Sequence, residues 1–486
     1  MKKPADILKN MEITEIMGNK NIVPEDIVFD SRKVAKNTAF FAIKGTQVDG
    51  HQYIDAAIEK GASVIVCEQP PPQITPDVTY IMVKNSEQAL AVAAANFYGH
   101  PSEKLRLIGI TGTNGKTTIA TLLYSLFEQL GHKSGLISTI KYAFSGTVHN
   151  ATHTTPDVVQ INKLLHSMVE KNCAYCFMEV SSHAIKQHRV HGLQFNGGIF
   201  TNITHEHLDY HGTFDDYLKT KQAFFNSLPE DAFALSNADD KNGKIILQNT
   251  RAAKYFYAMK SFADFRGKIM ERHLDGMLLN INNTEMWTKL TGDFNAYNLL
   301  AIYAYASIKG IDKREALKVL SSIKPVDGRF ETIVSSTGVY AIVDYAHTPD
   351  ALQNVLNTIN KIRKANQQLI TVVGAGGNRD KTKRPLMGKI SAELSSKIIL
   401  TSDNPRYEKP EVIISEMQEG IDSVNKQKML VITDRQQAIK TAVMMANKGD
   451  IVLVAGKGHE KYQEINGIRH HFDDKEVINE IFNDLI

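Results

Sequence analysis

The sequence contains few cysteines and no long hydrophobic run. Three cysteines in 486 residues exclude a disulfide framework and are typical of a reducing compartment. Two of them, Cys173 and Cys176, have C-x-x-C spacing, but the surrounding CAYCFMEV predicts a buried strand and disfavours redox or zinc chemistry. No apolar run approaches the roughly 18 residues of a membrane span, and MKKPADILKNME lacks the apolar core of a signal peptide. We therefore expect a cytoplasmic protein that is not inserted in a membrane.

The sequence also lacks an excess of charge of one sign. Its 56 basic residues nearly balance its 53 acidic ones, so no strong overall field attracts nucleic acid or a membrane surface. We expect no nucleic acid partner. Specific anion sites are still compatible with this balance, and the motifs have to identify them.

The most informative stretch begins at Leu105 and reads LRLIGITGTNGKTTIATLLYSLFEQLG. It predicts an apolar strand, a glycine-containing turn and a helix, which together direct backbone N–H groups and the positive end of the helix dipole at one small volume. That volume suits a phosphate, and a following Lys and Thr suit the outer phosphates and magnesium. The match to G-x-x-x-x-G-K-[ST] is imperfect, because Ile110 replaces the first glycine. The residues predicted to bind ATP here are Gly112, Thr113, Asn114, Gly115, Lys116, Thr117 and Thr118.

The length and the alternation of strand-like and helix-like segments predict an α/β protein of three domains, because one ordinary domain holds about 150 residues. We place the domains at residues 1–103, 104–331 and 332–486. The first is a small α/β domain, and the second is a phosphate-loop ATPase domain with a parallel sheet. The third is a doubly wound, Rossmann-like domain, because its strands and helices alternate regularly. In such sheets, ligands bind at the carboxyl ends of the strands.

Acidic and histidine side chains follow strands of the second domain. Glu179 closes an apolar strand, where a carboxylate either holds magnesium or caps the next helix, and both interpretations stay open. His205, His207 and His211 lie close together but lack the H-E-x-x-H spacing of a zinc helix. We therefore favour a place for one of them at a magnesium–nucleotide site over a zinc site.

Polar motifs also follow strands of the first and third domains. Ser31 and Arg32, within FDSRKV, lie beside a predicted strand end, in either a solvated loop or a binding loop. Arg379, Arg406 and Glu460 follow three strands of the third domain. The two guanidinium groups could bind carboxylates of a ligand, and the Glu460 carboxylate could bind its ammonium group. Together they would hold an amino acid. Dinucleotide binding at GAGGNRD is disfavoured, because the run lacks the full G-x-G-x-x-G.

Taken together, eleven motifs in one order along the chain resemble the Mur ligases, the ATP-dependent amide-forming enzymes of bacterial peptidoglycan synthesis. The motifs are FDSR, GTNGKTT, TTPD, EVSSHAIKQHRV, HLDYHGTFDDYLKTK, FNAYN, DGRFE, DYAHTPDA, GNRDKTKRP, DNPR and GKGHE. The resemblance implies that a substrate carboxylate attacks the γ-phosphorus of ATP, and that an amine then displaces phosphate from the acyl phosphate. The implied substrates are a UDP-N-acetylmuramoyl dipeptide, ATP and meso-diaminopimelate, and we expect a monomer.

The resemblance also implies roles for individual residues. It implies catalytic roles for Lys116, Glu179, His207, Lys221 and His347. It implies two magnesium ions, with Thr117, Glu179, His207 and Lys221 (as a carbamate) as ligands. It implies adenine and ribose contacts by Asn295, Arg329 and Asp344. It implies nucleotide-sugar contacts by Ser31, Arg32, Thr154, Thr155, Ser181, Gln187 and Arg189, and amino-acid contacts by Arg379, Asp403, Asn404, Pro405, Arg406, Gly456 and Glu460. The pair His205-Glu206 departs from the Arg-Asp pair that is common in the family.

The DNPR motif at residues 403–406 bears on the choice of amino acid. Diaminopimelate has one carboxylate more than lysine, and an Arg can pair with that group through two charge-assisted hydrogen bonds. Lysine would leave the Arg unpaired, and polar sites reject such analogues by as much as ~10⁴-fold. We therefore expect Arg406 to favour diaminopimelate.

Two other interpretations stay open. A different Mur-type ligase, adding D-alanyl-D-alanine or extending folylpolyglutamate, would share the phosphate loop, although DNPR and the Lys221 region disfavour it. A nucleotide-gated binding or regulatory protein would hydrolyse ATP without any amino acid. The predicted amino-acid pocket disfavours this second interpretation, because a switch does not need one.

Overall fold

The computed structural model describes residues 7–19, 21–45, 48–204, 206 and 208–484. The chain divides into two compact units, one of Met1–Ile203 with His211–Tyr255 and one of Thr204–Tyr210 with Phe256–Ile486. Each unit is described by itself. The domain boundaries predicted at 103/104 and 331/332 stay a prediction.

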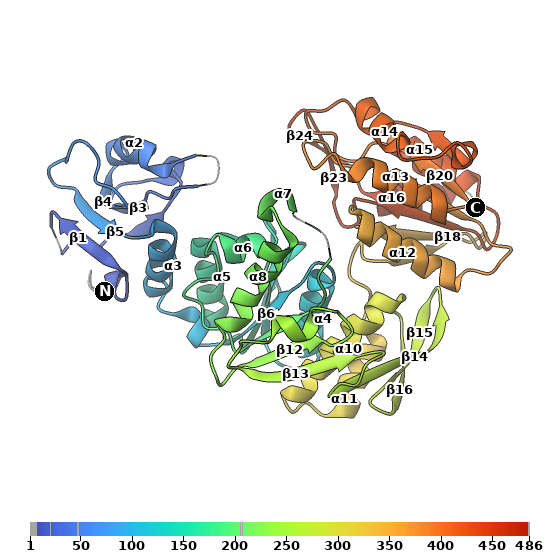
Figure 1. The fold of residues 1–486 in the computed structure, drawn as a ribbon, viewed down its shortest axis with the longest axis horizontal. Coiled ribbons are helices and arrows are strands. Elements are labelled where there is room, and N and C mark those ends of the chain that lie inside the picture. The colour runs from blue at the N-terminus through green and yellow to red at the C-terminus, as the bar shows by residue number, and fades with distance from the viewer. Residues whose placement is uncertain (1–6, 20, 46–47, 205, 207, 485–486) are drawn as a thin grey trace. The chain divides into compact units, whose positions relative to one another are not determined.

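A five-stranded sheet forms the beginning of the first unit (Figure 1). Its strand order is β1-β5-β4-β3-β2, and all neighbours are parallel except β1 and β5. The three central strands are almost entirely buried, as in sheets covered on both faces. The elements are β1 (Ile13–Met17), β2 (Asp26–Val28), η1 (Ser31–Lys33), β3 (Thr38–Phe41), η2 (Gly50–Tyr53), α2 (Ile54–Glu59), β4 (Ala62–Cys67), β5 (Thr79–Val83), α3 (Ser86–Phe97) and η3 (Pro101–Glu103).

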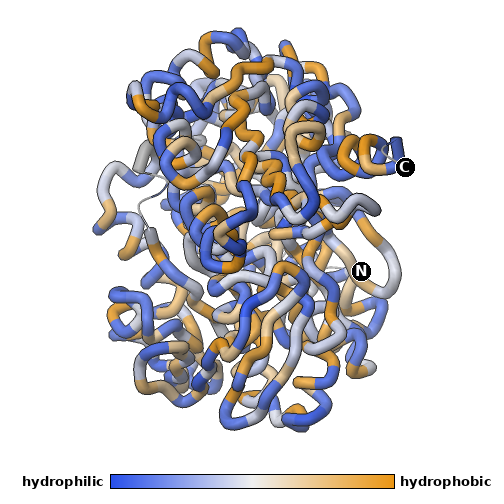
Figure 2. Tube along the Cα trace, turned by 90° about the vertical axis from the view of Figure 1, so that its right-hand side faces the viewer, coloured by the Kyte–Doolittle hydropathy of each residue, from blue (hydrophilic) through white to orange (hydrophobic). Residues whose placement is uncertain are grey.

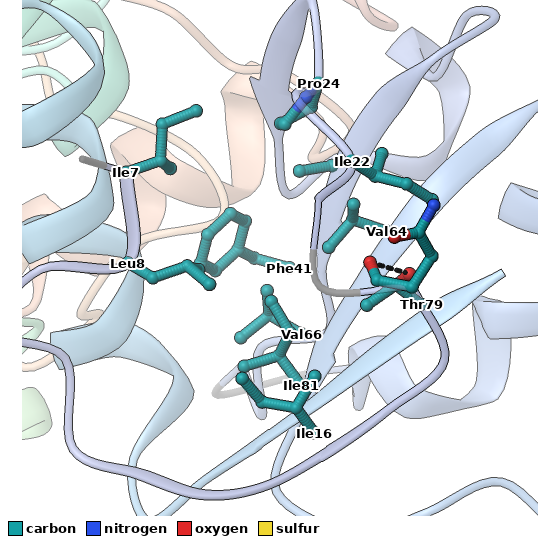
Figure 3. Close-up of a pocket in the computed structure, with 12 residues that line it drawn as sticks. Ile7, Leu8, Ile16, Ile22, Pro24, Phe41, Val64, Val66, Thr79 and Ile81 are labelled. Carbon is teal, nitrogen blue, oxygen red and sulfur yellow. Dashed lines mark hydrogen bonds between the residues drawn. The ribbon is translucent and has the colours of Figure 1, made fainter. Parts of the chain in front are cut away.

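A small apolar cavity lies against this sheet, and Figure 3 shows the side chains around it. Ile16, Phe41, Val66 and Ile81 line it from the strands. Its lining includes two polar residues, Asn19 and Thr79, and the Thr79 hydroxyl donates to the Asn19 carbonyl at 2.9 Å. The lining therefore has the character of protein core and not of a site for a nucleotide sugar.

The second sheet of this unit is built around β6, which lies between β10 and β11. The strands in the order β12-β11-β6-β10-β7 are all parallel, and β8 and β9 extend the sheet antiparallel. The carboxyl ends of β6, β10 and β11 therefore share one edge. The elements are β6 (Arg106–Thr111), α4 (Lys116–Gln129), β7 (Ser134–Ile137), β8 (Lys141–Phe144), β9 (Thr147–Asn150), α5 (Val158–Glu170), β10 (Tyr175–Glu179), α6 (Ser182–Lys186), β11 (Gly197–Phe200), α8 (Phe214–Asn226), β12 (Phe233–Asn237) and α9 (Gly243–Ile246). At the points where the chain passes between the units lie α7 (Leu208–His211) and β13 (Ala253–Ala258).

The second unit contains an antiparallel three-stranded segment and a separate six-stranded sheet. The six-stranded order is β17-β18-β22-β19-β20-β21, with only β17 antiparallel. Apolar residues of α12, α13 and α14 cover one face and those of α15 and α16 the other, which confirms the predicted doubly wound arrangement. The elements are β14 (Phe265–His273), β15 (Gly276–Ile281), β16 (Thr284–Thr288), α10 (Asp293–Ile308), α11 (Lys313–Ser322), β17 (Glu331–Val334), β18 (Tyr340–Asp344), α12 (Pro349–Ile362), β19 (Leu369–Val373), α13 (Lys383–Leu394), β20 (Lys397–Leu400), α14 (Pro410–Gln418), η4 (Asn425–Lys428), β21 (Met429–Val431), α15 (Arg435–Met444), β22 (Ile451–Ala455), β23 (Tyr462–Ile465), β24 (Ile468–His471) and α16 (Asp474–Asp484).

Hydrophobic stretches of the chain are short and alternate with hydrophilic ones (Figure 2). In the described ranges, no helix combines the length and the apolar character needed to cross a membrane.

Candidate active site

The predicted phosphate loop lies between buried strand β6 and helix α4. At Gly112, which has a φ of +150°, an added Cβ would lie 1.9 Å from Thr201 Oγ1. A larger residue therefore does not fit without moving the loop. Gly115, with a φ of +89°, is the residue before the first turn of α4. The helix predicted after the loop is confirmed, and its apolar residues Ile119, Leu122 and Leu126 are buried.

Residues that follow β11 hold the loop from the side. The Thr113 N–H donates to the Asn202 carbonyl at 2.8 Å, and the Asn114 N–H donates to Asn202 Oδ1 at 2.9 Å. Thr201 Oγ1 donates to the Asn114 carbonyl at 2.6 Å. Thr201 and Asn202 were not among the residues predicted from the sequence. Their signal is the TN pair at the end of the apolar run GGIF, beside the strand of the phosphate loop.

Two lysines reach the same part of the loop. Lys116 Nζ donates to the carbonyls of Gly112 at 3.0 Å and Thr113 at 2.7 Å. Lys221, on α8 and only 1% exposed, donates to the Gly112 carbonyl at 3.0 Å. Its Nζ lies 4.7 Å from the centre of the Tyr217 ring, and the Tyr217 hydroxyl is 3.1 Å from Thr113 Oγ1. The loop therefore combines a helix N-terminus with two cations, which suits a polyphosphate.

Glu179, at the end of β10, is fully buried beside this loop. Its Oε2 accepts from Thr117 Oγ1 at 2.9 Å, and its Oε1 accepts from the Thr139 N–H at 2.7 Å. The helix-cap interpretation of Glu179 is wrong, because Ser181 caps α6 through the Ala184 N–H. A carboxylate beside a hydroxyl is a set of hard oxygen donors, and magnesium prefers such donors.

The histidine cluster contributes less to this picture. His205 and His207 lie outside the described residues. His211 is buried, with Nε2 at 3.0 Å from Ser182 Oγ and Nδ1 at 3.4 Å from Asp216 Oδ2. Among the residues that the structure describes, no group of three His, Cys, Asp or Glu side chains is arranged to hold a metal ion. The described part of the predicted magnesium set is therefore Thr117, Glu179 and Lys221.

Most residues predicted to contact the nucleotide sugar lie together beside Glu179. Thr155 Oγ1 donates to the Glu179 carbonyl at 2.7 Å and accepts from the Ser181 N–H at 3.1 Å. Arg189 donates to the Thr155 carbonyl at 2.8 Å and, through Nε, to Gln187 Oε1 at 3.0 Å. The remaining member of this group, Thr154, is hydrogen-bonded to Thr139 at 3.1 Å.

Ser31 and Arg32 lie elsewhere in the first unit, on η1 after β2. The Arg32 side chain is 86% exposed and pairs with Asp30 at 2.9 Å. The Ser31 carbonyl accepts from Lys60 Nζ at 3.0 Å. This loop is thus a solvent-facing basic site whose predicted role in binding stays a prediction.

The residues predicted to contact adenine and ribose belong to the second unit. Asp344, at the end of β18, accepts from the Phe330 N–H at 2.7 Å, and burial raises the pKa of this carboxyl to about 6. The Arg329 guanidinium lies 4.6 Å from the Tyr345 ring centre. Asn295 lies in the first turn of α10, where its side chain donates to the Thr291 carbonyl at 2.8 Å.

Two histidines flank the Tyr345 ring. The His347 ring lies 4.5 Å from it and the His459 ring 4.9 Å from it, centre to centre. Burial, together with the Arg329 charge, lowers the pKa of His459 to about 3. His459 was not among the residues predicted from the sequence, although it is the His of the GKGHE motif.

The residues predicted to bind the amino acid follow β19, β20 and β22, whose carboxyl ends share one edge. Asp403 and Asn404 are buried. Asn404 Nδ2 donates to Glu460 Oε2 at 2.8 Å, so the DNPR and GKGHE motifs are in direct contact. At Gly456, which has a φ of +116°, an added Cβ would lie 2.6 Å from Asp403 Oδ2. This glycine permits the close approach of the two motifs.

The two predicted guanidinium groups differ in how firmly they are held. Arg406 has a left-handed φ of +53°, donates through Nη1 to the Gly377 carbonyl at 2.7 Å and lies 3.6 Å from the Glu464 carboxylate. Arg379 is exposed on the neighbouring loop. A Cβ on Gly377 would lie 1.9 Å from the Pro405 carbonyl, so the loop that carries Arg379 packs directly against the DNPR loop. Arg406 is thus fixed in place, whereas the Arg379 side chain faces solvent.

A buried ion cluster that the sequence did not predict joins these two loops. Arg384, 1% exposed, binds both Glu408 and Glu416 and donates to the Gly376 carbonyl at 3.1 Å. Glu408 also accepts from the Asn378 N–H, and its partners lower its pKa to about 2. The cluster connects the GNRD loop with the residues after DNPR.

Comparison with known proteins places this arrangement in a family. Three families match the chain: "Mur ligase family, catalytic domain" over residues 26–98, "Mur ligase middle domain" over 110–306 and "Mur ligase, glutamate ligase domain" over 328–458. A UDP-N-acetylmuramoyl-L-alanyl-D-glutamate--2,6-diaminopimelate ligase from Parabacteroides distasonis is 54% identical, over 98% of both chains. The chain belongs to the Mur ligase family. The ligase of the same name from Bacteroides fragilis is 52% identical over 99% of both chains.

Solved structures agree with this membership. The solved structure of a UDP-N-acetylmuramoyl-L-alanyl-D-glutamate--2,6-diaminopimelate ligase is similar to this chain with a TM-score of 0.70 and 30% identity, covering 100% of this chain and 99% of that one. MurF ligase from Thermotoga maritima, in complex with ADP, shares the fold with a TM-score of 0.61 at 19% identity, covering 94% and 97%. The predicted three-domain α/β fold is confirmed. The predicted ATP-dependent, ADP-forming ligase class is confirmed as well, which excludes the regulatory interpretation.

Proposed function

We propose that this Mur ligase joins meso-2,6-diaminopimelate to the D-glutamate γ-carboxylate of UDP-N-acetylmuramoyl-L-alanyl-D-glutamate, with conversion of ATP to ADP and phosphate. The observation that carries the proposal is the arrangement of the DNPR loop, in which a fixed Arg406 adjoins buried Asp403 and Asn404. Relatives at 52 to 54% identity over almost the whole chain bear the name of this activity. The reaction belongs to peptidoglycan precursor synthesis.

The proposed reaction has two steps. An oxygen of the γ-carboxylate attacks the γ-phosphorus of ATP, the bond to ADP breaks, and an acyl phosphate forms. The amino group of diaminopimelate then attacks the acyl carbon, the carbon–oxygen bond to phosphate breaks, and the amide, phosphate and a proton are released. Both steps need neutralised charge and aligned reactants, and neither needs a covalent bond to the enzyme.

In the first unit, the phosphate loop holds the ATP phosphates. The backbone N–H groups at the start of α4 and the Lys116 ammonium face the loop volume, and these are the groups that bind transferring phosphates. The predicted sugar-nucleotide contacts Thr154, Thr155 and Ser181 lie beside Glu179. Ser31 and Arg32 complete that predicted set. Gln187 and Arg189 support it from the turn that follows α6.

Magnesium, when bound, would neutralise phosphate charge as a Lewis acid. Thr117 and Glu179 fit one ion, because their oxygens are hard donors 2.9 Å apart next to the loop. We assign a second ion to His207 and Lys221.

This assignment requires Lys221 to be a carbamate, in which the cation becomes an anion. The N–H of a carbamate could still donate to the Gly112 carbonyl, as Lys221 Nζ does. Carbon-13 NMR in labelled bicarbonate should show a carbamate signal in the wild type that the K221R variant lacks. An active enzyme without that signal would contradict the assignment.

In the second unit, Asn295, Arg329 and Asp344 are assigned to adenine and ribose, and His347 stands two residues beyond β18 next to the Tyr345 ring. The amino acid is assigned to Arg379, Asp403, Asn404, Pro405, Arg406, Gly456 and Glu460. Arg406 would pair with the far carboxylate of diaminopimelate and Glu460 would receive an ammonium group. We further propose that the enzyme works as a cytoplasmic monomer, which light scattering on the purified protein would test.

The proposal is tested by following ADP and product mass with the UDP-muramoyl dipeptide labelled with oxygen-18 in the γ-carboxylate. With diaminopimelate, the expected result is one amide product per ADP and one oxygen-18 atom in the released phosphate. D-Alanyl-D-alanine should give no product. ADP formation without a ligated product, or phosphate free of the label, would contradict the proposal.

A further inference from the structure

Lys457 of the GKGHE motif lies in the second unit and has no role among the groups assigned above. Its side chain has no exposed surface. It follows β22 directly after Gly456, the residue at which only a glycine allows the strand to approach Asp403. A fully buried ammonium is costly unless anions and hydrogen-bond acceptors surround it. Its neighbours therefore show what the fold gains from it.

Three polar groups share this ammonium, and all three belong to the proposed amino-acid site. Nζ donates to Asn404 Oδ1 at 3.1 Å and lies 3.6 Å from Asp403 Oδ1 and 3.5 Å from Glu460 Oε2. The Tyr462 ring lies 5.6 Å away. Lysine suits this position because its compact charge can serve several acceptors at once, whereas a guanidinium has a fixed fork geometry.

The charges in this cluster do not cancel. Asp403 and Glu460 contribute two carboxylates and Lys457 one ammonium, so one negative charge is left for a ligand. Nearby Arg435 is engaged by its own carboxylate, Asp474, at 2.7 Å. The remaining charge therefore matches the ammonium of an amino acid.

The pKa of Glu460 depends on this balance of charges. Burial and the Asp403 charge raise its pKa, and the Lys457 charge, the hydrogen bond from Asn404 and the His347 charge oppose them. The titratable rings of Tyr345 and Tyr462 also face it. Without Lys457, the two carboxylates would repel each other with no buried cation between them.

We infer that Lys457 is a positioning residue for the amino-acid site: its buried ammonium fixes Asp403, Asn404 and Glu460 in one arrangement and keeps Glu460 an anion that can receive the substrate ammonium. The inference rests on the proposed function, because it concerns the site assigned there to diaminopimelate. It adds a residue that need not touch the substrate, and it predicts how that residue acts.

The test is the KM for diaminopimelate of the wild type and of K457M between pH 7 and pH 9. Met has a similar volume but no charge, so the pKa of Glu460 should rise further and a smaller fraction of Glu460 should be ionised at pH 7. The KM should then rise about tenfold, the factor that corresponds to one pKa unit. The ratio of the two KM values should fall toward one as the pH rises and Glu460 ionises. Using the ratio cancels the titration of the substrate itself.

Three further variants separate charge from packing. K457R keeps the positive charge, so the ratio of its KM for diaminopimelate to that of the wild type should not change with pH. K457M/D403N removes one charge of each sign. Its KM ratio to the wild type should therefore depend on pH much less than the ratio for K457M does. K461M alters an adjacent lysine that is 70% exposed and should behave as the wild type. If K457M fails to fold, restored folding in K457M/D403N would support the charge balance, and continued unfolding would overturn it.

The outcomes distinguish the inference from the function on which it rests. A wild type that forms no product with diaminopimelate would overturn the proposed function, and this inference with it. An active wild type with a K457M ratio that stays constant with pH would overturn the inference alone.

Discussion

The phosphate loop of the first unit and the amino-acid loops of the second are held in place by different means. The phosphate loop depends on backbone contacts, with Gly112 against Thr201 and the N–H groups of residues 113 and 114 on Asn202. The amino-acid loops depend on two buried cations. Arg384 forms ion pairs with two glutamates. Lys457 contacts Asp403, Asn404 and Glu460.

This difference has a functional consequence. A polyphosphate is bound by a fixed set of N–H groups and cations, so backbone geometry is sufficient to form its site. An amino acid carries charges of both signs, so the site needs side chains whose ionisation is controlled. We therefore expect variants of the first site to lose turnover at every pH and variants of the second to change selectivity or pH dependence.

The largest effect is expected for K116M in the phosphate loop. Loss of the ammonium that faces the transferring phosphate should lower kcat by about 10²- to 10³-fold, the range for removal of one preorganised charge-stabilising group. Steady-state ADP formation measures it from pH 7 to pH 9, and the loss should be constant over that range. The exposed Lys171, as K171M, is the control. A variant with near-normal kcat would show that Lys116 is not a phosphate ligand.

The largest effect on stability, as opposed to activity, is expected from R435M behind the amino-acid loops. Arg435 and Asp474 form a fully buried ion pair at 2.7 Å, and the variant would leave the Asp474 carboxylate without its partner. Breaking such a pair costs about 3–5 kcal/mol in unfolding free energy. Urea denaturation should detect this loss of unfolding free energy in the transition that includes the second unit. The control K389M alters a lysine in an exposed ion pair and should show little change. Equal unfolding free energies of R435M and the wild type would show that the Arg435–Asp474 ion pair does not stabilise the fold.

A smaller effect should come from the raised pKa of Asp344. The folded state binds this proton more tightly than the unfolded chain, because burial raises the pKa from 3.8 to about 6. The resulting stability is complete below pH 3.8 and is lost as the pH rises through 6, by at most about 3 kcal/mol. D344N lacks this titration, so its unfolding free energy should fall less between pH 4 and pH 7. Parallel curves for the variant and the wild type would show that the carboxyl is not desolvated.

The smallest effect should be a change of selectivity in R406K. Lysine keeps the charge but cannot form the bidentate pair with a carboxylate, so kcat/KM for diaminopimelate should fall about tenfold, roughly the value of one charge-assisted hydrogen bond. The value for lysine should hardly change. R469K, on the adjacent hairpin strand β24, is the control. Equal losses for both amino acids would indicate a folding defect instead of lost recognition.

The sequence predicted the parts of the molecule that are encoded locally. The strand–loop–helix around Lys116, the apolar face of α4 and the doubly wound third sheet follow from periodicity and turn residues within short windows. Parallel strands also place GNRD, DNPR and GKGHE at one edge, so the motifs of the amino-acid site could be grouped before their contacts were known.

The missed features depend on contacts between distant residues. Asn202 is 88 positions from Asn114 and holds the loop through one amide oxygen. Lys457 is 53 positions from Asn404, and a lysine in a motif carries no local sign that it is buried. Arg384 lies on helix α13, and nothing in its local sequence indicates that it pairs with Glu408 and Glu416, which are 24 and 32 positions away.

The most direct test of the central claim is a competition between equal concentrations of meso-diaminopimelate and lysine, with the UDP-muramoyl dipeptide and ATP, and the two products counted by mass. The account predicts that the diaminopimelate product exceeds the lysine product by about 100-fold or more, because a buried polar site rejects an analogue that lacks its partner group. Equal amounts of the two products, or an excess of the lysine product, would contradict it.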